Sequence, residues 1–188
     1  MKNFKTLALA FVFVLSGAAV SAQTKKIDVS KSTINWVGKK VTGQHSGTVN
    51  FKDGAVVFSG KKLKGGSFTV DMPSLNATDL SGEYQTKLNG HLKADDFFGT
   101  DKYPTATLVF KTIGAKSADL YTVTADLTIK GITNPVTFDV AVKGNTATTA
   151  FKVDRTKYNI KYNSGSFFES LGDKTIDDNF ELSIVLKF

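Results

Sequence analysis

Alternation of apolar and polar residues dominates the chain. From Leu120 to Lys130 every second side chain is apolar, and the positions between them carry threonine, aspartate or lysine. The same period of two recurs from Pro135 to Lys143 and from Asn179 to Phe188. A period of two is that of a strand with one buried face. These three segments are therefore predicted to be half-buried antiparallel strands.

Shorter segments of the same kind fill the first half of the chain. They read "STINWVG", "SGTVNF", "GAVVFSG" and "GGSFTVDM", and turn sequences such as "KDG" and "GKKLKGG" separate them. Eight or more strands at close spacing with alternating faces predict an all-β fold, either a sandwich or a closed barrel.

One segment breaks this period. Between Leu80 and Leu92 the apolar spacing changes to four, which places Leu80, Tyr84, Leu88 and Leu92 on one side of a predicted helix. Asp79 or Ser81 is expected to cap the start of the helix. The helix should end before Gly99 and Tyr103-Pro104, because proline disfavours helix in the residue before it.

The N-terminal sequence predicts export. Lys2 and Lys5 precede an apolar run from Leu7 to Leu15, and Val20-Ser21-Ala22 follows it. This pattern is typical of a secretory signal peptide, and the run is shorter than the roughly 20 apolar residues that span a bilayer. We expect cleavage after Ala22, a periplasmic location, and a single domain formed by residues 23–188.

Charge and cysteine content exclude several functions. Loss of Lys2 and Lys5 with the signal peptide lowers the net charge from +7 to +5, and the remaining lysines are scattered. An exported protein with this pattern is not expected to bind nucleic acid, whereas attraction to anionic lipid head groups remains open. The chain has no cysteine, which excludes disulfides, thiol nucleophiles and cysteine-ligated metals.

His91 and the neighbouring carboxylates of Asp95 and Asp96 are the first candidates for chemistry. The helical spacing points His91 inward, and a histidine beside a carboxylate can serve as an acid/base pair. The favoured interpretation is structural, with a partly buried histidine and two aspartates that cap the turn carrying Phe97-Phe98. His45 is the only other histidine, and no metal site is predicted.

Arg155 is the only arginine of the chain. It continues the inward phase of Thr149, Phe151 and Val153, and a guanidinium can grip a carboxylate or phosphate with two hydrogen bonds. Arg155 could hold an anionic head group at the mouth of a pocket or pair with a carboxylate such as Asp173 or Asp177. The pattern leaves both interpretations open.

Three blocks of sequence together resemble the YceI-like family of exported, lipocalin-like proteins. They are "HLKADDFFGTDKYPTATLVF" from His91, "LTIKGITNPVTFDV" from Leu127 and "SGSFFESLGDKTIDDNFELSIVLKF" from Ser164. After Arg155, the family's Asp-Phe-Gly-Ile-like run reads Lys157-Tyr158-Asn159-Ile160, so an acid becomes a base and a glycine is lost. The resemblance implies an eight-stranded antiparallel lipocalin-like barrel with a short helical insertion. It implies no catalytic residues.

The resemblance also implies a ligand, namely a long isoprenoid chain such as a polyprenyl phosphate or a quinone, bound inside the barrel without a further cofactor. The residues expected to line the barrel are Trp36, Phe58, Phe68, Phe97, Phe98, Phe110, Phe138, Phe151, Phe167 and Phe168. The candidates for contact with a head group are Arg155, His91, His45 and Tyr158. Transient contact with a membrane surface and a homodimer are possible.

Two alternatives remain at this point. One is an envelope enzyme that acts on a lipid or quinone through His91 and Asp95 or Asp96. The other is a barrel packed solid with side chains, which would serve as a stress-related interaction module.

Overall fold

The structure is a computed structural model that describes residues 22–188; apart from Ala22, the predicted signal peptide lies outside these residues. The described chain contains nine strands, one α-helix and two short 3-10 helices. In chain order they are β1 (Ala22–Lys26), β2 (Thr33–Lys40), β3 (Gly43–Ser59), β4 (Lys62–Ala77), α1 (Gly82–Lys93), β5 (Thr105–Ala115), β6 (Leu120–Ile129), β7 (Ile132–Lys143), β8 (Thr146–Asp154), η1 (Arg155–Tyr158), η2 (Gly172–Lys174) and β9 (Ile176–Lys187).

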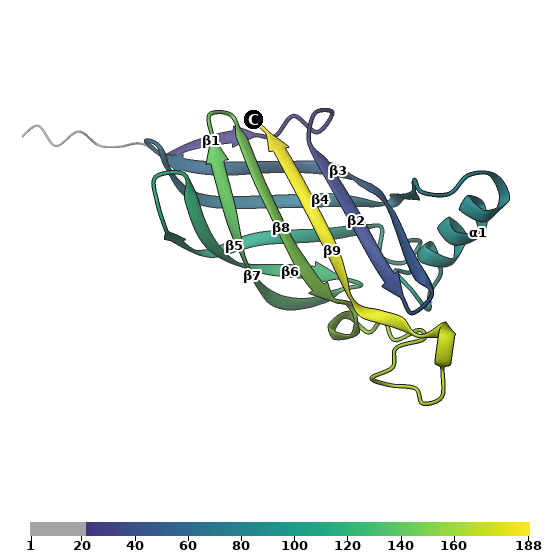
Figure 1. The fold of residues 1–188 in the computed structure, drawn as a ribbon. Helices are drawn as coiled ribbons and strands as arrows, with labels where there is room; N and C mark the ends of the chain where they lie inside the picture. The colour runs from purple at the N-terminus through teal and green to yellow at the C-terminus, as the bar shows by residue number, and fades with distance from the viewer. Residues whose placement is uncertain (1–21) are drawn as a thin grey trace, which may run out of the picture.

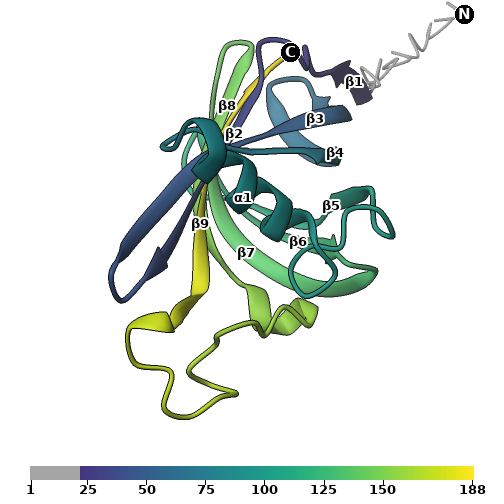
Figure 2. The ribbon, with the colours of Figure 1, turned by 90° about the vertical axis from the view of Figure 1, so that its right-hand side faces the viewer.

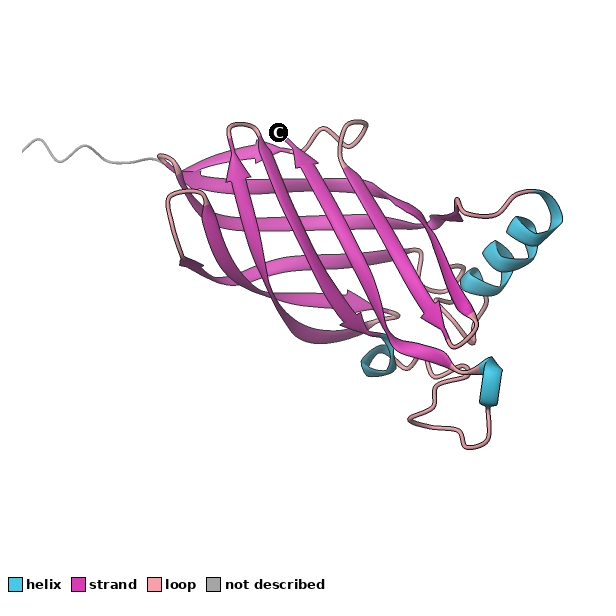
Figure 3. Cartoon of the chain, in the orientation of Figure 1, coloured by secondary structure: helices cyan, strands magenta, loops and turns pink. Residues whose placement is uncertain are grey.

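Eight of the strands close into an elongated antiparallel barrel (Figures 1 and 3). Strands β3 to β9 pair in chain order, and β2 closes the ring between β9 and β3. The ninth strand, β1, pairs with residues 55–59 of β3, beyond the part of β3 that β2 covers. The predicted eight-stranded barrel with a short helical insertion is confirmed.

The predicted turn at "KDG" is wrong. Residues 43–59 form one continuous strand, and the ladder with β4 continues on both sides of Lys52, from Phe51–Val70 to Asp53–Thr69. The extra residue is absorbed as a shift of register, which is how a β-bulge bends a strand without ending it.

The helix forms where the sequence predicts it, but its apolar stripe is only partly used. Leu88 and Leu92 pack against the core, whereas Tyr84 is 75% exposed. Figure 2 shows α1 lying across one end of the barrel, and its last turns approach the interior. Ser81 occupies the N-cap position without a capping hydrogen bond from its side chain.

Close packing of β3 against β2 and β4 leaves no room at Gly47. A methyl group on this residue would lie 1.9 Å from the carbonyl oxygen of Asn76 and 2.6 Å from Cζ2 of Trp36. Glycine is therefore required because the Asn76 backbone and the indole ring of Trp36 already occupy that space.

We expect Gly47→Ala to lower the free energy of unfolding by about 2 kcal/mol, as overpacking of a filled core does. Urea unfolding followed by far-UV circular dichroism measures this. Gly38→Ala is the matched control in the paired strand β2, since no atom lies within 4 Å of the added methyl group. Equal midpoints for the two variants would contradict the packing argument.

Candidate functional site

An apolar cavity of about 170 Å³ lies inside the barrel. Its wall takes residues from all eight barrel strands, from Leu92 of α1 and from the loop that follows the helix. Seven of the predicted lining residues lie on this wall: Trp36, Phe68, Phe97, Phe98, Phe110, Phe138 and Phe151. The interior is therefore neither an open channel nor completely filled by side chains.

Three of the predicted lining residues do not reach the cavity. Phe58 is buried against Phe188, with ring centroids 5.5 Å apart, and Phe167 and Phe168 are 48% and 50% exposed. Phe51 and Phe180 line the cavity and were not predicted. Both could have been found from the alternation alone, because each lies in the inward phase of its strand.

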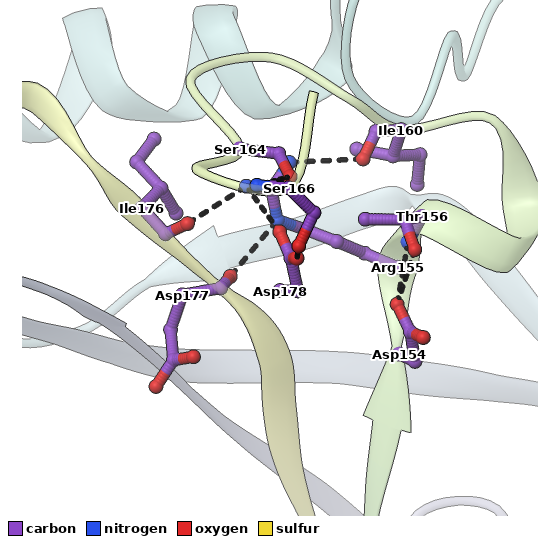
Figure 4. A network of polar contacts seen from close by, with 9 residues as sticks. All are labelled: Asp154, Arg155, Thr156, Ile160, Ser164, Ser166, Ile176, Asp177 and Asp178. Carbon is purple, nitrogen blue, oxygen red and sulfur yellow. Dashed lines mark hydrogen bonds and ion pairs between the residues drawn. The ribbon is translucent and has the colours of Figure 1, made fainter. Parts of the chain in front are cut away.

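Arg155 borders the cavity but its side chain is held by the backbone (Figure 4). Nε donates to the Asp177 carbonyl at 3.0 Å, Nη1 to that of Ile160 at 2.9 Å and Nη2 to that of Ile176 at 3.0 Å. The residue is 2% exposed, and Nη2 lies 3.6 Å from Oδ1 of Asp178. These contacts describe a structural clamp that joins η1 to the start of β9.

The charges around Arg155 fit this role. Burial lowers the pKa of the guanidinium, and among the carboxylates that oppose this change Asp178 has the largest effect. Burial would raise the pKa of Asp178, but the hydroxyl groups of Ser164 and Ser166 and the charge of Arg155 outweigh it, so that pKa is lowered. Both groups are therefore charged near neutral pH, and each stabilises the other.

His91, Asp95 and Asp96 do not converge on the cavity. Nε2 of His91 lies 3.5 Å from Oδ2 of Asp96, and the imidazole meets the ring of Tyr162 edge-on at 4.5 Å. Asp95 pairs instead with Lys102 at 2.5 Å. None of the three lines the cavity wall.

The other two candidates for head-group contact also lie away from the cavity. Nδ1 of His45 lies 2.8 Å from Oδ2 of Asp79, one of the two residues expected to cap the helix. Tyr158 is 1% exposed, and burial, with a smaller effect of Asp154, raises the pKa of its hydroxyl to about 12. Arg155 is thus the one head-group candidate on the cavity wall.

Two further searches covered residues 22–188. Within them, no group of three or more histidine, cysteine, aspartate or glutamate side chains is placed to hold a metal ion. No helix in the described part of the chain has the length and apolar character needed to cross a membrane.

Residues 26–188 match the model of the YceI-like domain. The chain belongs to the YceI-like family. A UPF0312 protein of Pseudomonas putida strain W619 is 30% identical over 149 residues, which are 76% of this YceI-like chain and 73% of that protein. A UPF0312 protein of Staphylococcus aureus strain USA300 is 44% identical over 71 residues, 36% of this chain, and the match spans only 39% of the staphylococcal protein.

Solved structures share the fold of this YceI-like protein. BcnA of Burkholderia cenocepacia superposes with a TM-score of 0.63 at 25% identity, over 85% of this chain and 98% of BcnA. A polyisoprenoid binding domain from Saccharophagus degradans, implicated in plant cell wall breakdown, superposes with a TM-score of 0.57 at 18% identity. That match covers 86% of this chain and 95% of the domain.

The clamp predicts that Arg155→Lys lowers the free energy of unfolding by about 3 kcal/mol, because the ammonium cannot reach all three carbonyls and leaves buried acceptors without a donor. Urea unfolding measures the loss. Lys152→Met, which removes an exposed ion pair between β8 and Glu181 of β9, should stay within about 0.5 kcal/mol. If Arg155→Lys kept its midpoint and lost only lipid binding, the arginine would instead serve a head group.

Proposed function

We propose that this YceI-like protein binds a long apolar isoprenoid lipid, of the polyprenyl phosphate or quinone class, inside its barrel and carries it in the cell envelope without converting it chemically. The apolar cavity, whose wall includes nine aromatic residues, is the observation that carries the proposal. Family membership supports it, as does the shared fold of the domain from Saccharophagus degradans, which is described as polyisoprenoid binding.

The size of the cavity limits how such a ligand is held. An apolar cavity of roughly 150 Å³ accommodates one benzene ring, and this one measures about 170 Å³. It can receive a slender segment of an isoprenoid chain, and a longer segment requires side chains to move. The rings of Phe98, Phe110, Phe151 and Phe180 are only partly buried, so they are less confined than the fully buried rings of the wall.

The positions of the candidate acid/base groups favour carriage over catalysis. A catalytic pair must reach the reacting atoms of its substrate within hydrogen-bond distance. The imidazole of His91 packs between the rings of Phe97 and Tyr162 outside the cavity wall, and Asp95 pairs with Lys102. A ligand inside the barrel would not meet this group of residues.

Contact with a membrane is part of the proposal, because an isoprenoid lipid is exchanged with a bilayer. The aromatic loop, residues 161–175, extends from the α1 end of the barrel (Figure 1) and exposes Tyr162, Phe167 and Phe168. Nζ of Lys161 lies 4.4 Å from the centre of the Phe167 ring. Exposed aromatic rings beside a lysine suit the interface of an anionic bilayer. The N-terminal sequence supports a periplasmic location.

We expect Ala147→Phe to weaken lipid binding by about tenfold or more, because the ring would occupy the cavity. Binding of a quinone with a ten-carbon isoprenoid tail can be followed by quenching of Trp36, the only tryptophan, which lines the cavity. Ala150→Phe is the matched control, since Ala150 faces outward on the same strand.

The same titration separates the alternatives. His91→Ala should bind the quinone like the wild type, and turnover of the quinone that depended on His91 would contradict carriage. The proposal would be contradicted if the wild-type protein, purified from the cell envelope in which it is made, carried no lipid and did not bind the quinone. That result would favour an interaction module.

Replacing Phe167 and Phe168 together by serine should lower partitioning onto vesicles of phosphatidylethanolamine and phosphatidylglycerol by about tenfold or more, since each ring no longer inserts. Vesicle sedimentation measures this, and quinone binding in solution should stay unchanged. Tyr84→Ser, which removes a more exposed aromatic ring from α1, is the control. A wild-type dimer that the double variant dissociates would assign the loop to self-association instead.

A further inference from the structure

The wall of the barrel is incomplete between β7 and β8. Their ladder has four residue pairs, from Lys143–Thr146 to Val140–Thr149, whereas β6 and β7 share ten and β8 and β9 share nine. Beyond the fourth pair the two strands diverge (Figure 3). We call the unpaired part, residues 132–139 of β7 and 150–154 of β8, the β7–β8 seam.

The sequence of β7 fits an unpaired edge. Backbone groups in an antiparallel ladder point alternately toward one neighbour and the other. Ile129 and Ile132 form the pair that closes the two-residue turn between β6 and β7, and their backbone groups point toward each other. Because the direction alternates along β7, the backbone of Pro135, three residues later, points toward β8. Proline has no N–H to donate, so a complete ladder could not form there.

Side chains close the seam in place of a ladder. Thr149 Oγ1 donates to the Asp139 carbonyl at 2.7 Å at one end, and Asn134 Nδ2 donates to the Lys157 carbonyl at 3.0 Å at the other. Between them the rings of Phe138 and Phe151 stack, with centroids 4.3 Å apart and planes 11° apart. Both rings also line the cavity.

The seam between β4 and β5 is also incomplete and can be compared with the β7–β8 seam. Strands β4 and β5 share five pairs, and the unpaired part of that seam contains Leu63, Phe110 and Ile113. Of these three, Phe110 lines the cavity, and its ring lies over Gly66. Only β5 therefore contributes a cavity-lining ring there, whereas the unpaired part of the β7–β8 seam has such a ring on each strand, and no ladder must break for these two rings to separate.

We propose that the isoprenoid chain enters and leaves the barrel sideways through the β7–β8 seam, and that the stacked rings of Phe138 and Phe151 form its gate. This inference rests on the proposed function, because it concerns access to the same cavity. A lateral route lets a long chain slide in along its length, and the ligand need not thread past α1 at the end of the barrel.

The test is the rate of quinone uptake, measured by stopped-flow quenching of Trp36. Phe151→Ala should bind and release the ten-carbon isoprenoid quinone about fivefold faster, since it removes the stacked pair. Phe68→Ala removes an equivalent ring of the cavity wall from a strand paired on both sides. It should change the affinity but leave the association rate within about twofold of the wild type.

A cross-link tests the route without truncating a core side chain. The chain has no cysteine, so a short bifunctional maleimide would react only with cysteines introduced at Thr137 and Lys152, which face outward on either side of the seam. Bridging them should slow uptake by at least about tenfold and trap a quinone that was loaded beforehand. Cysteines at Thr107 and Thr128, opposite each other in the complete part of the β5–β6 ladder, are the control pair.

Equal association rates for the bridged and unbridged seam would overturn the gate while leaving lipid binding intact. If the wild-type chain bound no quinone at equilibrium, both the proposed function and the proposed gate would be wrong.

Discussion

One guanidinium holds together the end of the barrel at which the cavity, the helix and the aromatic loop meet. Arg155 supplies hydrogen bonds to the carbonyls of Ile160, Ile176 and Asp177, which lie on both sides of the aromatic loop. Buried carbonyls without donors are unfavourable, so this end of the barrel depends on a charge placed among backbone dipoles. The same clamp fixes where β8 ends, and therefore positions one edge of the β7–β8 seam.

The interior combines a stable shell with an incompletely filled centre. An eight-stranded barrel is just wide enough to be filled by side chains or to hold one slender ligand. Here the inward residues of β6 are all buried, whereas Phe180, Leu182 and Ile184 on the opposite side remain partly accessible. The wall of the apolar cavity therefore combines fully buried residues, such as Leu127 and Ile129 of β6, with partly buried residues of β9.

The sequence allowed most of the fold to be predicted, because a period of two identifies strands and their buried faces. It did not distinguish a bulge from a turn at Lys52, since only the partner strand β4 determines whether pairing continues. The inward phase of Arg155 was visible, but its three acceptors are backbone carbonyls, which no side-chain pattern reveals. Phe167 and Phe168 were expected to line the barrel and are exposed, because the aromatic loop extends away from the barrel.

The short β7–β8 ladder links local chemistry to the behaviour of the whole barrel. If the ladder continued in register, Pro135 would stand opposite Asp154, immediately before the clamp residue Arg155. Proline has no N–H to donate there, so the ladder cannot be complete at the position that faces the end of β8. Oδ1 of Asp154 accepts hydrogen bonds from the backbone and hydroxyl of Thr156 and so caps the start of η1. The end of β8 is therefore set by this cap and by the Arg155 clamp, and the seam beside it is closed by side chains.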